Sequence, residues 1–300
     1  MSVWRLIFSD LSSPRPLSYR QTRPVLVTMK TSRAKILLLG DSITQISFSP
    51  SLCGWGVYIA DRYQRRADVL NRGYSGYNTD WFLRLVATDA GRADILDDHR
   101  ENNVCLVTVF FGANDASDPI LNARKHVPLN RYESNLKDIV TLIRTNFGED
   151  VGIILISPPP ICHEGRLRFQ KELYKDKATG ELERTLELSG LYAQCGAKVA
   201  NEMNIPFIDL WTNMQFTSTG VERTNWREFL SDGLHLSTLG NQFLGEAVID
   251  VIDKSFPQLS VKPTPETGNI SSGSTCLAIA QMGPWHDEID DTNPDKAFQN

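Results

Sequence analysis

The chain has 300 residues, of which 41% are hydrophobic and 22% are charged, a composition typical of a globular domain rather than a fibrous chain. Its net charge of −5 gives no support for nucleic-acid binding, which needs a basic face, and no apolar run approaches the roughly 18 residues of a membrane span. The five cysteines lack metal-ligand spacing, and their odd number argues against a complete disulfide framework, so we expect a reducing compartment.

The first segment, residues 1–33, differs in composition from the rest of the chain. It holds six Arg or Lys residues and one acid, Asp10, with scattered Ser and Pro. Mitochondrial transit peptides share this bias, although three prolines interrupt a long amphipathic helix here. We favour the alternative of a basic, poorly ordered extension. A cytoplasmic location is expected, or a mitochondrial one if the segment is a transit peptide, and Met29 is an alternative start to Met1.

Apolar runs and helical patterns alternate between residues 34 and 258. The predicted strands cover 35–40, 68–73, 104–112, 151–157 and 205–210, and the predicted helices cover about 55–66, 79–97, 131–146, 184–203 and 238–255. Continuous apolar strands separated by helices indicate a parallel sheet that is covered on both faces. We therefore predict one α/β domain, residues 34–258, with the fold of a flavodoxin-like three-layer α/β/α sandwich around a five-stranded parallel sheet.

The last segment, residues 259–300, is acidic. It contains six acids and two lysines, with Pro, Gly, Ser and Asn throughout. Low hydrophobicity combined with net charge is typical of chains that cannot bury enough apolar surface to fold. The composition therefore predicts a disordered acidic tail.

Polar and glycine residues come directly after the predicted strands. They form the motifs "GDS" (40–42), "NRGYSGYNT" (71–79), "GANDAS" (112–117) and "SDGLHLSTLGNQ" (231–242). Because functional groups gather at the carboxyl ends of parallel strands, we expect these motifs to meet at one edge of the sheet. Each motif alone also has a structural interpretation: a serine after a strand is a common helix N-cap, and a single histidine is more often structural than catalytic.

Together the motifs supply the groups that a serine hydrolase needs, namely a nucleophile, a base, a group that orients the base, and oxyanion donors. Ser42 is the candidate nucleophile. Asp232 and His235 are three residues apart, so the carboxylate can reach one imidazole nitrogen while the other faces Ser42. Asn114 offers a side-chain amide, and Gly73 offers a backbone N–H with no side chain in the way.

These four motifs resemble the four sequence blocks of the SGNH hydrolases, also called GDSL esterases. The resemblance spans about residues 35–255. The stretches "GWGVYIADRYQRRADVLNRGYSGYNT", "HVPLNRYESNL", "SPPPICHE" and "DLWTNMQ" are similar to the isoamyl acetate-hydrolysing esterase subgroup. The resemblance implies a catalytic triad of Ser42, Asp232 and His235, and an oxyanion hole formed by Ser42, Gly73 and Asn114.

The implied activity is hydrolysis of short-chain acyl esters, such as acetates, through an acyl-enzyme, without metal or cofactor. The alternatives are a carbohydrate O-deacetylase, a lysophospholipase-like lipase and, outside the enzymes, a catalytically dead binding module. The expected partner is a small-molecule ester, and we expect neither nucleic-acid binding nor a membrane span. The sequence leaves the oligomeric state open, and a homodimer is one of the possibilities. Two further residues are candidates for the substrate pocket: Trp55, for which a core position is the equal alternative, and Asp41, which we expect rather to hold the turn at Ser42.

Overall fold

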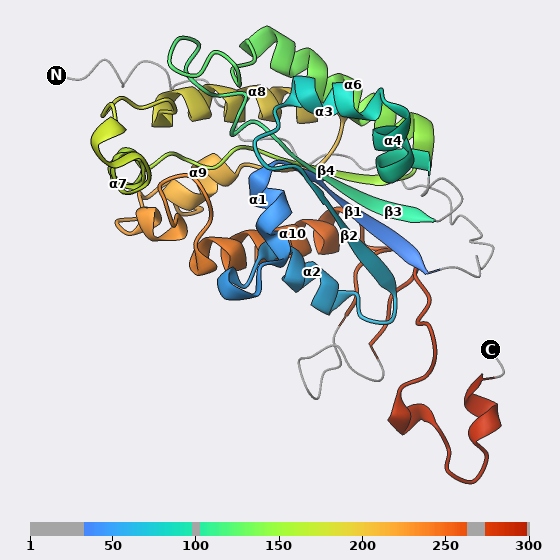
Figure 1. Ribbon diagram of the computed structural model, residues 1–300. Coiled ribbons are helices and arrows are strands. Elements are labelled where there is room, and N and C mark those ends of the chain that lie inside the picture. Colours follow the sequence, from blue (N-terminus) through green and yellow to red (C-terminus); the bar gives the residue numbers. More distant parts are fainter. Residues whose placement is uncertain (1–32, 98–102, 263–273, 299–300) are drawn as a thin grey trace. The chain divides into compact units, whose positions relative to one another are not determined.

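Five parallel strands form one sheet at the centre of the protein (Figure 1). The structure is a computed structural model that describes residues 33–97, 103–262 and 274–298, so all of the basic segment 1–33 except Arg33 lies outside the described residues. Across the sheet the strands are β2 (Ala67–Gly73), β1 (Ala34–Gly40), β3 (Val104–Phe110), β4 (Gly152–Ile156) and β5 (Phe207–Ile208). The predicted five-stranded parallel sheet is therefore confirmed, although β5 is shorter than the sequence suggested.

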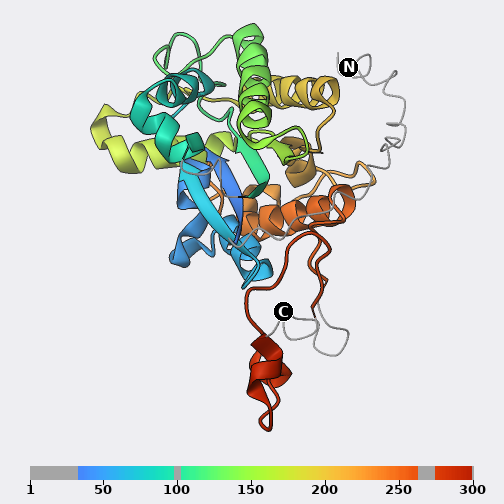
Figure 2. The same cartoon turned by 90° about the vertical axis from the view of Figure 1, so that its right-hand side faces the viewer.

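Helices cover both faces of the sheet, as Figure 2 shows. On one face, Ile36 and Leu38 of β1 pack in a cluster with α2 (Trp55–Arg62), α9 (Leu210–Gln215) and α10 (Thr238–Ser255). On the other face, Leu37 and Leu39 pack in a cluster with α3 (Thr79–Val86), α6 (Leu129–Phe147) and α8 (Leu186–Met203). Successive residues of a strand point to opposite faces, so a run of four buried apolar residues in β1 fits a strand enclosed between two helix layers.

The helix predictions differ from the structure in two places. The predicted helix 79–97 is divided into α3, α4 (Asp89–Arg92) and a π-helical turn (Ala93–Asp97), because the Thr88 side chain accepts a hydrogen bond from the Gly91 N–H and starts a new helix. The sequence patterns also gave no indication of α1 (Ser42–Gln45), α7 (His163–Tyr174) and α9. Within the described part of the chain, no helix is both long enough and apolar enough to cross a membrane.

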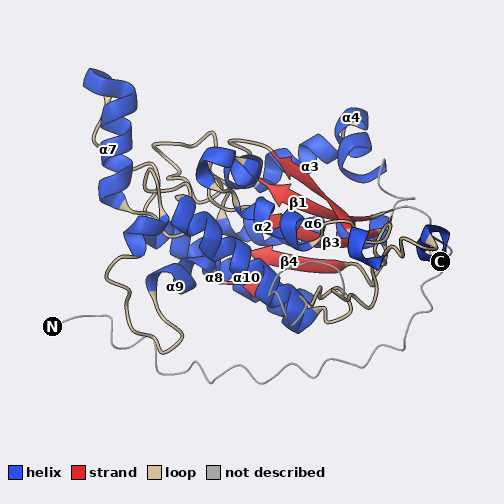
Figure 3. Cartoon of the chain, turned by 90° about the horizontal axis from the view of Figure 1, so that it is seen from below, coloured by secondary structure: helices blue, strands red, loops and turns tan. Residues whose placement is uncertain are grey.

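The C-terminal segment differs from the expected disordered tail in the parts that the structure describes. Leu259, Val261 and Ile279 are buried against the core. The guanidinium of Arg66, just before β2, donates to the backbone carbonyls of Ser274 and Ile279. Three apolar residues that precede the acidic stretch 287–295 therefore anchor the first part of this segment. It packs at the amino ends of the strands, opposite to α7 (Figure 3).

Candidate active site

Ser42 lies in the turn between β1 and α1. Asp41 is the N-cap of α1, and its Oδ1 accepts a hydrogen bond from the Ile43 N–H at 2.9 Å. Ser42 is the first residue of the helix, where a backbone N–H has no acceptor within the helix. The turn thus presents both the hydroxyl and a free N–H of Ser42 at the carboxyl edge of the sheet.

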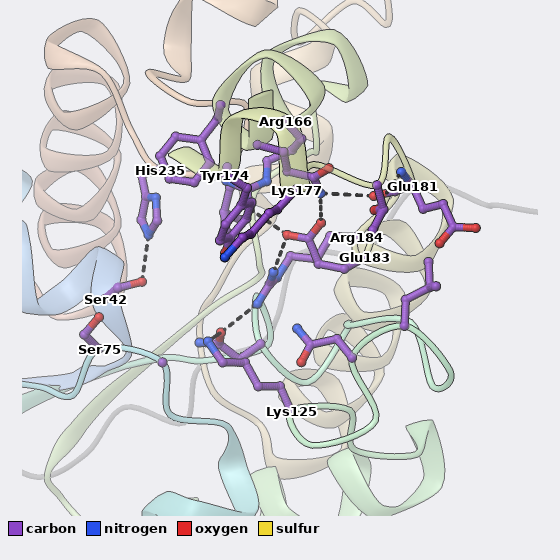
Figure 4. A pocket seen from close by; sticks show the side chains of 18 residues that line it. Ser42, Ser75, Lys125, Arg166, Tyr174, Lys177, Glu181, Glu183, Arg184 and His235 are labelled. Atoms are coloured by element: carbon purple, nitrogen blue, oxygen red, sulfur yellow. Dashed lines mark hydrogen bonds and ion pairs between the residues drawn. The ribbon is translucent and has the colours of Figure 1, made fainter. Parts of the chain in front are cut away.

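Ser42, His235 and Asp232 form a continuous hydrogen-bonded chain, and Figure 4 draws its link between Ser42 and His235. Ser42 Oγ lies 2.9 Å from His235 Nε2, and His235 Nδ1 lies 2.8 Å from Asp232 Oδ2. The other carboxylate oxygen, Asp232 Oδ1, accepts from the backbone N–H groups of Leu234 and His235 at 3.0 and 2.8 Å. Burial opposes ionisation of Asp232, but the hydrogen bonds and charge of His235 outweigh it and hold the pKa of this carboxyl well below its usual range. The anionic carboxylate can therefore orient the imidazole as a base toward Ser42.

The side-chain amide of Asn114 is fixed from both of its ends. Its Oδ1 faces two cations, with Arg184 Nη2 at 3.0 Å and Lys125 Nζ at 3.4 Å. Its Nδ2 donates to the Tyr77 carbonyl at 2.9 Å and lies 3.5 Å from Asp41 Oδ2. Because both cationic groups need an acceptor, the amide NH2 faces away from them. Asn114 lines the same cavity as Ser42, where this amide can serve a developing oxyanion.

The structure corrects the glycine of the predicted oxyanion hole. The Gly73 N–H donates to Asn71 Oδ1 at 2.9 Å, and a Cβ on Gly73 would lie only 2.1 Å from the Gln45 backbone nitrogen, so this glycine is packed against α1. Gly76 lines the cavity with a φ of +82°. Among the described residues, its N–H has no hydrogen-bond acceptor. Gly76 rather than Gly73 is therefore the glycine beside Ser42 and Asn114.

Neither of the two candidate pocket residues lines the cavity. Trp55 is 0% exposed, donates through its indole N–H to the Ile43 carbonyl, and meets Phe110 edge-to-face in the core. Asp41 is 1% exposed, and burial raises its pKa to about 6. Trp55 thus takes the core position that was its equal alternative, and Asp41 holds the turn at Ser42 as we expected.

The cavity above Ser42 has a volume of about 590 Å³, and its wall combines polar and charged side chains with apolar ones such as Leu121 and Phe169 (Figure 4). One side is formed by α7 and the loop after it, with Arg166, Glu183 and Arg184. The start of α7 rests on the catalytic loop: the Cys162 N–H donates to the Gly233 carbonyl at 3.0 Å, and a Cβ on Gly233 would lie 2.4 Å from the Arg166 nitrogen. No motif in the sequence marked these charged residues, since they act through contacts between distant segments.

Metal binding was not expected from the sequence. In the part of the chain that the structure describes, no three His, Cys, Asp or Glu side chains are grouped so that they could hold a metal ion.

Comparisons with known proteins agree with this geometry. A family model described as GDSL-like lipase/acylhydrolase matches residues 36–248. A GDSL esterase/lipase of Arabidopsis thaliana is 44% identical, covering 72% of this chain and 84% of the relative. The isoamyl acetate-hydrolyzing esterase 1 homolog of Mus musculus is 41% identical over 75% of this chain and 84% of the relative, and the isoamyl acetate-hydrolyzing esterase of Saccharomyces cerevisiae is 31% identical over 76% and 90%.

Solved structures share the fold. A lipase/acylhydrolase from Enterococcus faecalis superposes with a TM-score of 0.52 at 25% identity and covers 74% of this chain and 96% of its own. The acetylxylan esterase Axe2 from Geobacillus stearothermophilus has a TM-score of 0.52 at 21% identity, with 74% and 94% covered, which is a likeness of fold alone. The family match and these identities lead to one conclusion: the chain belongs to the GDSL-like lipase/acylhydrolase family and is a serine hydrolase of carboxylic esters.

Proposed function

We propose that this protein hydrolyses short-chain acyl esters, acetates above all, through an acyl-enzyme on Ser42. The observation that carries the proposal is the unbroken chain from Ser42 Oγ through His235 to Asp232, with links of 2.9 and 2.8 Å, at the floor of an open cavity. The names of the mouse and yeast relatives support acetate esters as the first substrates to test. An intact nucleophile, base and orienting acid also argue against a catalytically dead binding module.

In the proposed reaction, His235 Nε2 takes the proton of Ser42 Oγ as this oxygen attacks the ester carbonyl. The tetrahedral oxyanion accepts hydrogen bonds from the Ser42 N–H, the Gly76 N–H and the Asn114 amide. His235 then gives its proton to the departing alcohol, which breaks the ester bond and leaves the acyl group on Ser42. Water, deprotonated by His235, attacks this acyl-enzyme, and the acid leaves as Ser42 regains its proton.

Polar side chains in the wall of the cavity favour a second candidate, an O-deacetylase acting on a hydroxyl-rich alcohol such as a sugar. Besides the catalytic groups, the wall includes Asn122, Gln170 and Thr179, all of which can bind hydroxyl groups. A lysophospholipase-like activity has less support, because a long acyl chain needs a continuous apolar surface.

A substrate panel tests the proposal and separates these candidates. p-Nitrophenyl esters with acyl chains from C2 to C12 are compared by kcat/KM, together with acetylated sugars assayed by acetate release. The expected result is highest kcat/KM at C2 to C4 and a steep loss toward C12. Highest values at C12 would contradict the proposal in favour of a lipase, and efficient release of acetate from sugars would favour the deacetylase.

A further inference from the structure

Four charged side chains link the two halves of the active site. Arg166 Nη1 lies 3.1 Å from Asp232 Oδ2, and Arg166 Nη2 lies 2.7 Å from Glu183 Oε1. The same Glu183 oxygen accepts from Arg184 Nη1 at 3.0 Å. The chain begins at Asp232, the acid of the triad, and ends at Asn114, whose Oδ1 accepts from Arg184 Nη2. Figure 4 labels its middle members, Arg166, Glu183 and Arg184.

The charges in this chain alternate and are largely withdrawn from solvent. The side chains of Arg166 and Arg184 are 7% and 6% exposed, and those of Glu183 and Asp232 are 18% and 14% exposed. A buried ion network seldom adds stability beyond what apolar residues of the same size would give, because each charge must lose its water. Stability alone therefore does not account for four such charges in one place.

The contact between Arg166 and Asp232 affects the catalytic base, His235. Arg166 binds Asp232 Oδ2, the same oxygen that accepts from His235 Nδ1. A cation at that oxygen fixes the carboxylate and weakens its field at the imidazole. Glu183 in turn neutralises part of the Arg166 charge. The two groups therefore act on the imidazole with opposite signs.

The contact between Arg184 and Asn114 affects the oxyanion hole. Arg184 is held by its Nε, which donates to the Ala113 carbonyl at 2.8 Å, and by Glu183. With its remaining nitrogen directed at Asn114 Oδ1, Arg184 selects the amide orientation in which the NH2 faces away from the cations. Lys125 Nζ lies 3.4 Å from the same oxygen.

We propose that Arg166, Glu183 and Arg184 are positioning residues that hold Asp232 and Asn114 in one rigid frame, and that Arg166 and Glu183 set the protonation of His235 in opposite directions. The proposal rests on the ester hydrolysis proposed above. The charged groups around the Asp232–His235 pair come from three elements: Arg166 from α7, Glu183 and Arg184 from the loop before α8, and Asp41 from the turn before α1.

The test for the base compares Arg166→Met and Glu183→Gln by the pH dependence of kcat/KM. Loss of the Arg166 cation strengthens the field of Asp232 and favours the imidazolium, so the acid limb moves to higher pH. Loss of the Glu183 charge leaves Arg166 uncompensated, so the limb moves to lower pH. Each shift is expected to be about 0.5–1 pH unit, below the effect of a charge in direct contact. Arg166→Lys, which keeps the charge, should return the limb toward the wild-type position.

The test for the oxyanion hole is a double-mutant cycle. Arg184→Met is expected to lower kcat by about 10- to 100-fold, with little change in KM. The loss of a group that only orients a functional side chain has an effect of this size in metal sites. In an Asn114→Ala background the same substitution should cost nothing further, because Arg184 acts through the amide that is already missing. Additive losses would overturn this part of the proposal.

The control is Arg66→Met, which removes another buried arginine, one that lies far from the cavity and binds backbone carbonyls. Arg66→Met should lower the melting temperature and leave both kcat and the acid limb of the pH dependence of kcat/KM unchanged. If the arginine variants do not fold, Glu183→Gln decides alone, since it keeps the side-chain shape. An unmoved limb in that variant, or limbs that move in the same direction in both variants, would contradict the proposal.

The failure of this proposal is distinguishable from failure of the proposed function. The same pH dependence can be measured as the rate at which a fluorophosphonate labels Ser42, because His235 must accept the proton in that reaction too. Labelling that tracks the expected shifts while no ester is hydrolysed would refute the proposed function and leave the positioning roles standing.

Discussion

The two ends of the sheet each bury an arginine, and the two arginines have different partners. At the carboxyl end, Arg184 is 5% exposed and binds Glu183, the Ala113 carbonyl and the amide of Asn114. At the amino end, Arg66 is 4% exposed and binds Ser274 and the Ile279 carbonyl, all in the C-terminal segment. The first arrangement fixes side chains that take part in chemistry, whereas the second fastens one stretch of chain to another. Changes at the carboxyl end should therefore alter rates, and changes at the amino end should alter stability.

The largest effect is expected for Ser42→Ala. The substitution removes the nucleophile, so hydrolysis of p-nitrophenyl acetate should fall by at least about 1,000-fold. The side chain is small and stands at the cavity surface, so the melting temperature should change little. Fluorophosphonate labelling of the wild type followed by peptide mass spectrometry provides the control. A variant that keeps more than about a thousandth of the activity would remove Ser42 from its assigned role.

Asn114→Ala should have the next largest effect. Loss of one oxyanion donor typically lowers kcat by about 10²- to 10³-fold. Because the amide serves the transition state more than the ground state, KM should be nearly unchanged. Steady-state kinetics on an acetate ester measure both constants. An unchanged kcat would mean that Asn114 only shapes the loop after β3.

The two glycines of "NRGYSGYNT" sharpen the comparison within the carboxyl end. In Gly73→Ala the new Cβ meets the Gln45 backbone, so the free energy of unfolding should fall by about 1–3 kcal/mol, as in other overpacked sites. In Gly76→Ala the nearest atom is the flexible Lys125 Nζ at 3.3 Å, so the cost in stability comes from the φ of +82° alone, about 1–2 kcal/mol, and the distinguishing change is a loss of kcat. Thermal unfolding and kinetics of both variants test the assignment. Full stability in Gly73→Ala with a lost kcat would restore Gly73 as the donor.

A truncated chain that ends at Lys262 tests the role of the C-terminal segment at the amino end of the sheet. The truncation removes Ile279, which is 4% exposed, and burial of such a side chain contributes about 2 kcal/mol. The melting temperature should fall by about 4–8 °C, while kcat and KM for acetate esters keep their wild-type values. A stable but inactive truncated chain would break the comparison, because the C-terminal segment would then matter to the catalytic end.

The last effect appears only when the pH is varied, and it concerns Asp115, a buried acid at the carboxyl end. Burial raises its pKa from 3.8 to about 7, against the opposing hydrogen bonds of Thr79. The folded protein then keeps a proton that the unfolded chain releases, so the contribution of Asp115 to stability is complete below pH 3.8 and is lost as the pH rises toward about 7. The slope is at most about 1.4 kcal/mol per pH unit. In Asp115→Asn this slope should vanish from urea unfolding curves measured between pH 4 and 7.

The correct predictions from the sequence depended on local patterns. Unbroken apolar runs indicated the buried strands, and the order of the motifs placed Ser42, Asn114 and His235 at a common edge. The hydrogen bond between Asp232 and His235 could be predicted from their spacing, because side chains three residues apart in a tight loop have few possible relative positions.

The features that the sequence did not predict depend on contacts between distant segments. Arg166 and Asp232 are 66 residues apart, and no periodicity signals that they meet. Gly73 and Gly76 look alike in one motif, and only the register, in which Gly73 pairs with Gly40 inside the sheet, separates them. The helix α7 has few apolar positions, so its sequence carries little helical periodicity.

The contact between Gly233 and the start of α7 has a consequence for how such a pocket can diversify. The segment from Cys162 to Arg166 is seated on the catalytic loop, while the far end of α7, with Leu173 and Tyr174, is exposed. Insertions or deletions between Gln170 and Glu181 would thus reshape this wall of the cavity without moving the residues that contact the catalytic loop. Substrate range can therefore change during evolution through the length of the segment 170–181. The chemistry stays the same as long as the start of α7 keeps its contact with the catalytic loop.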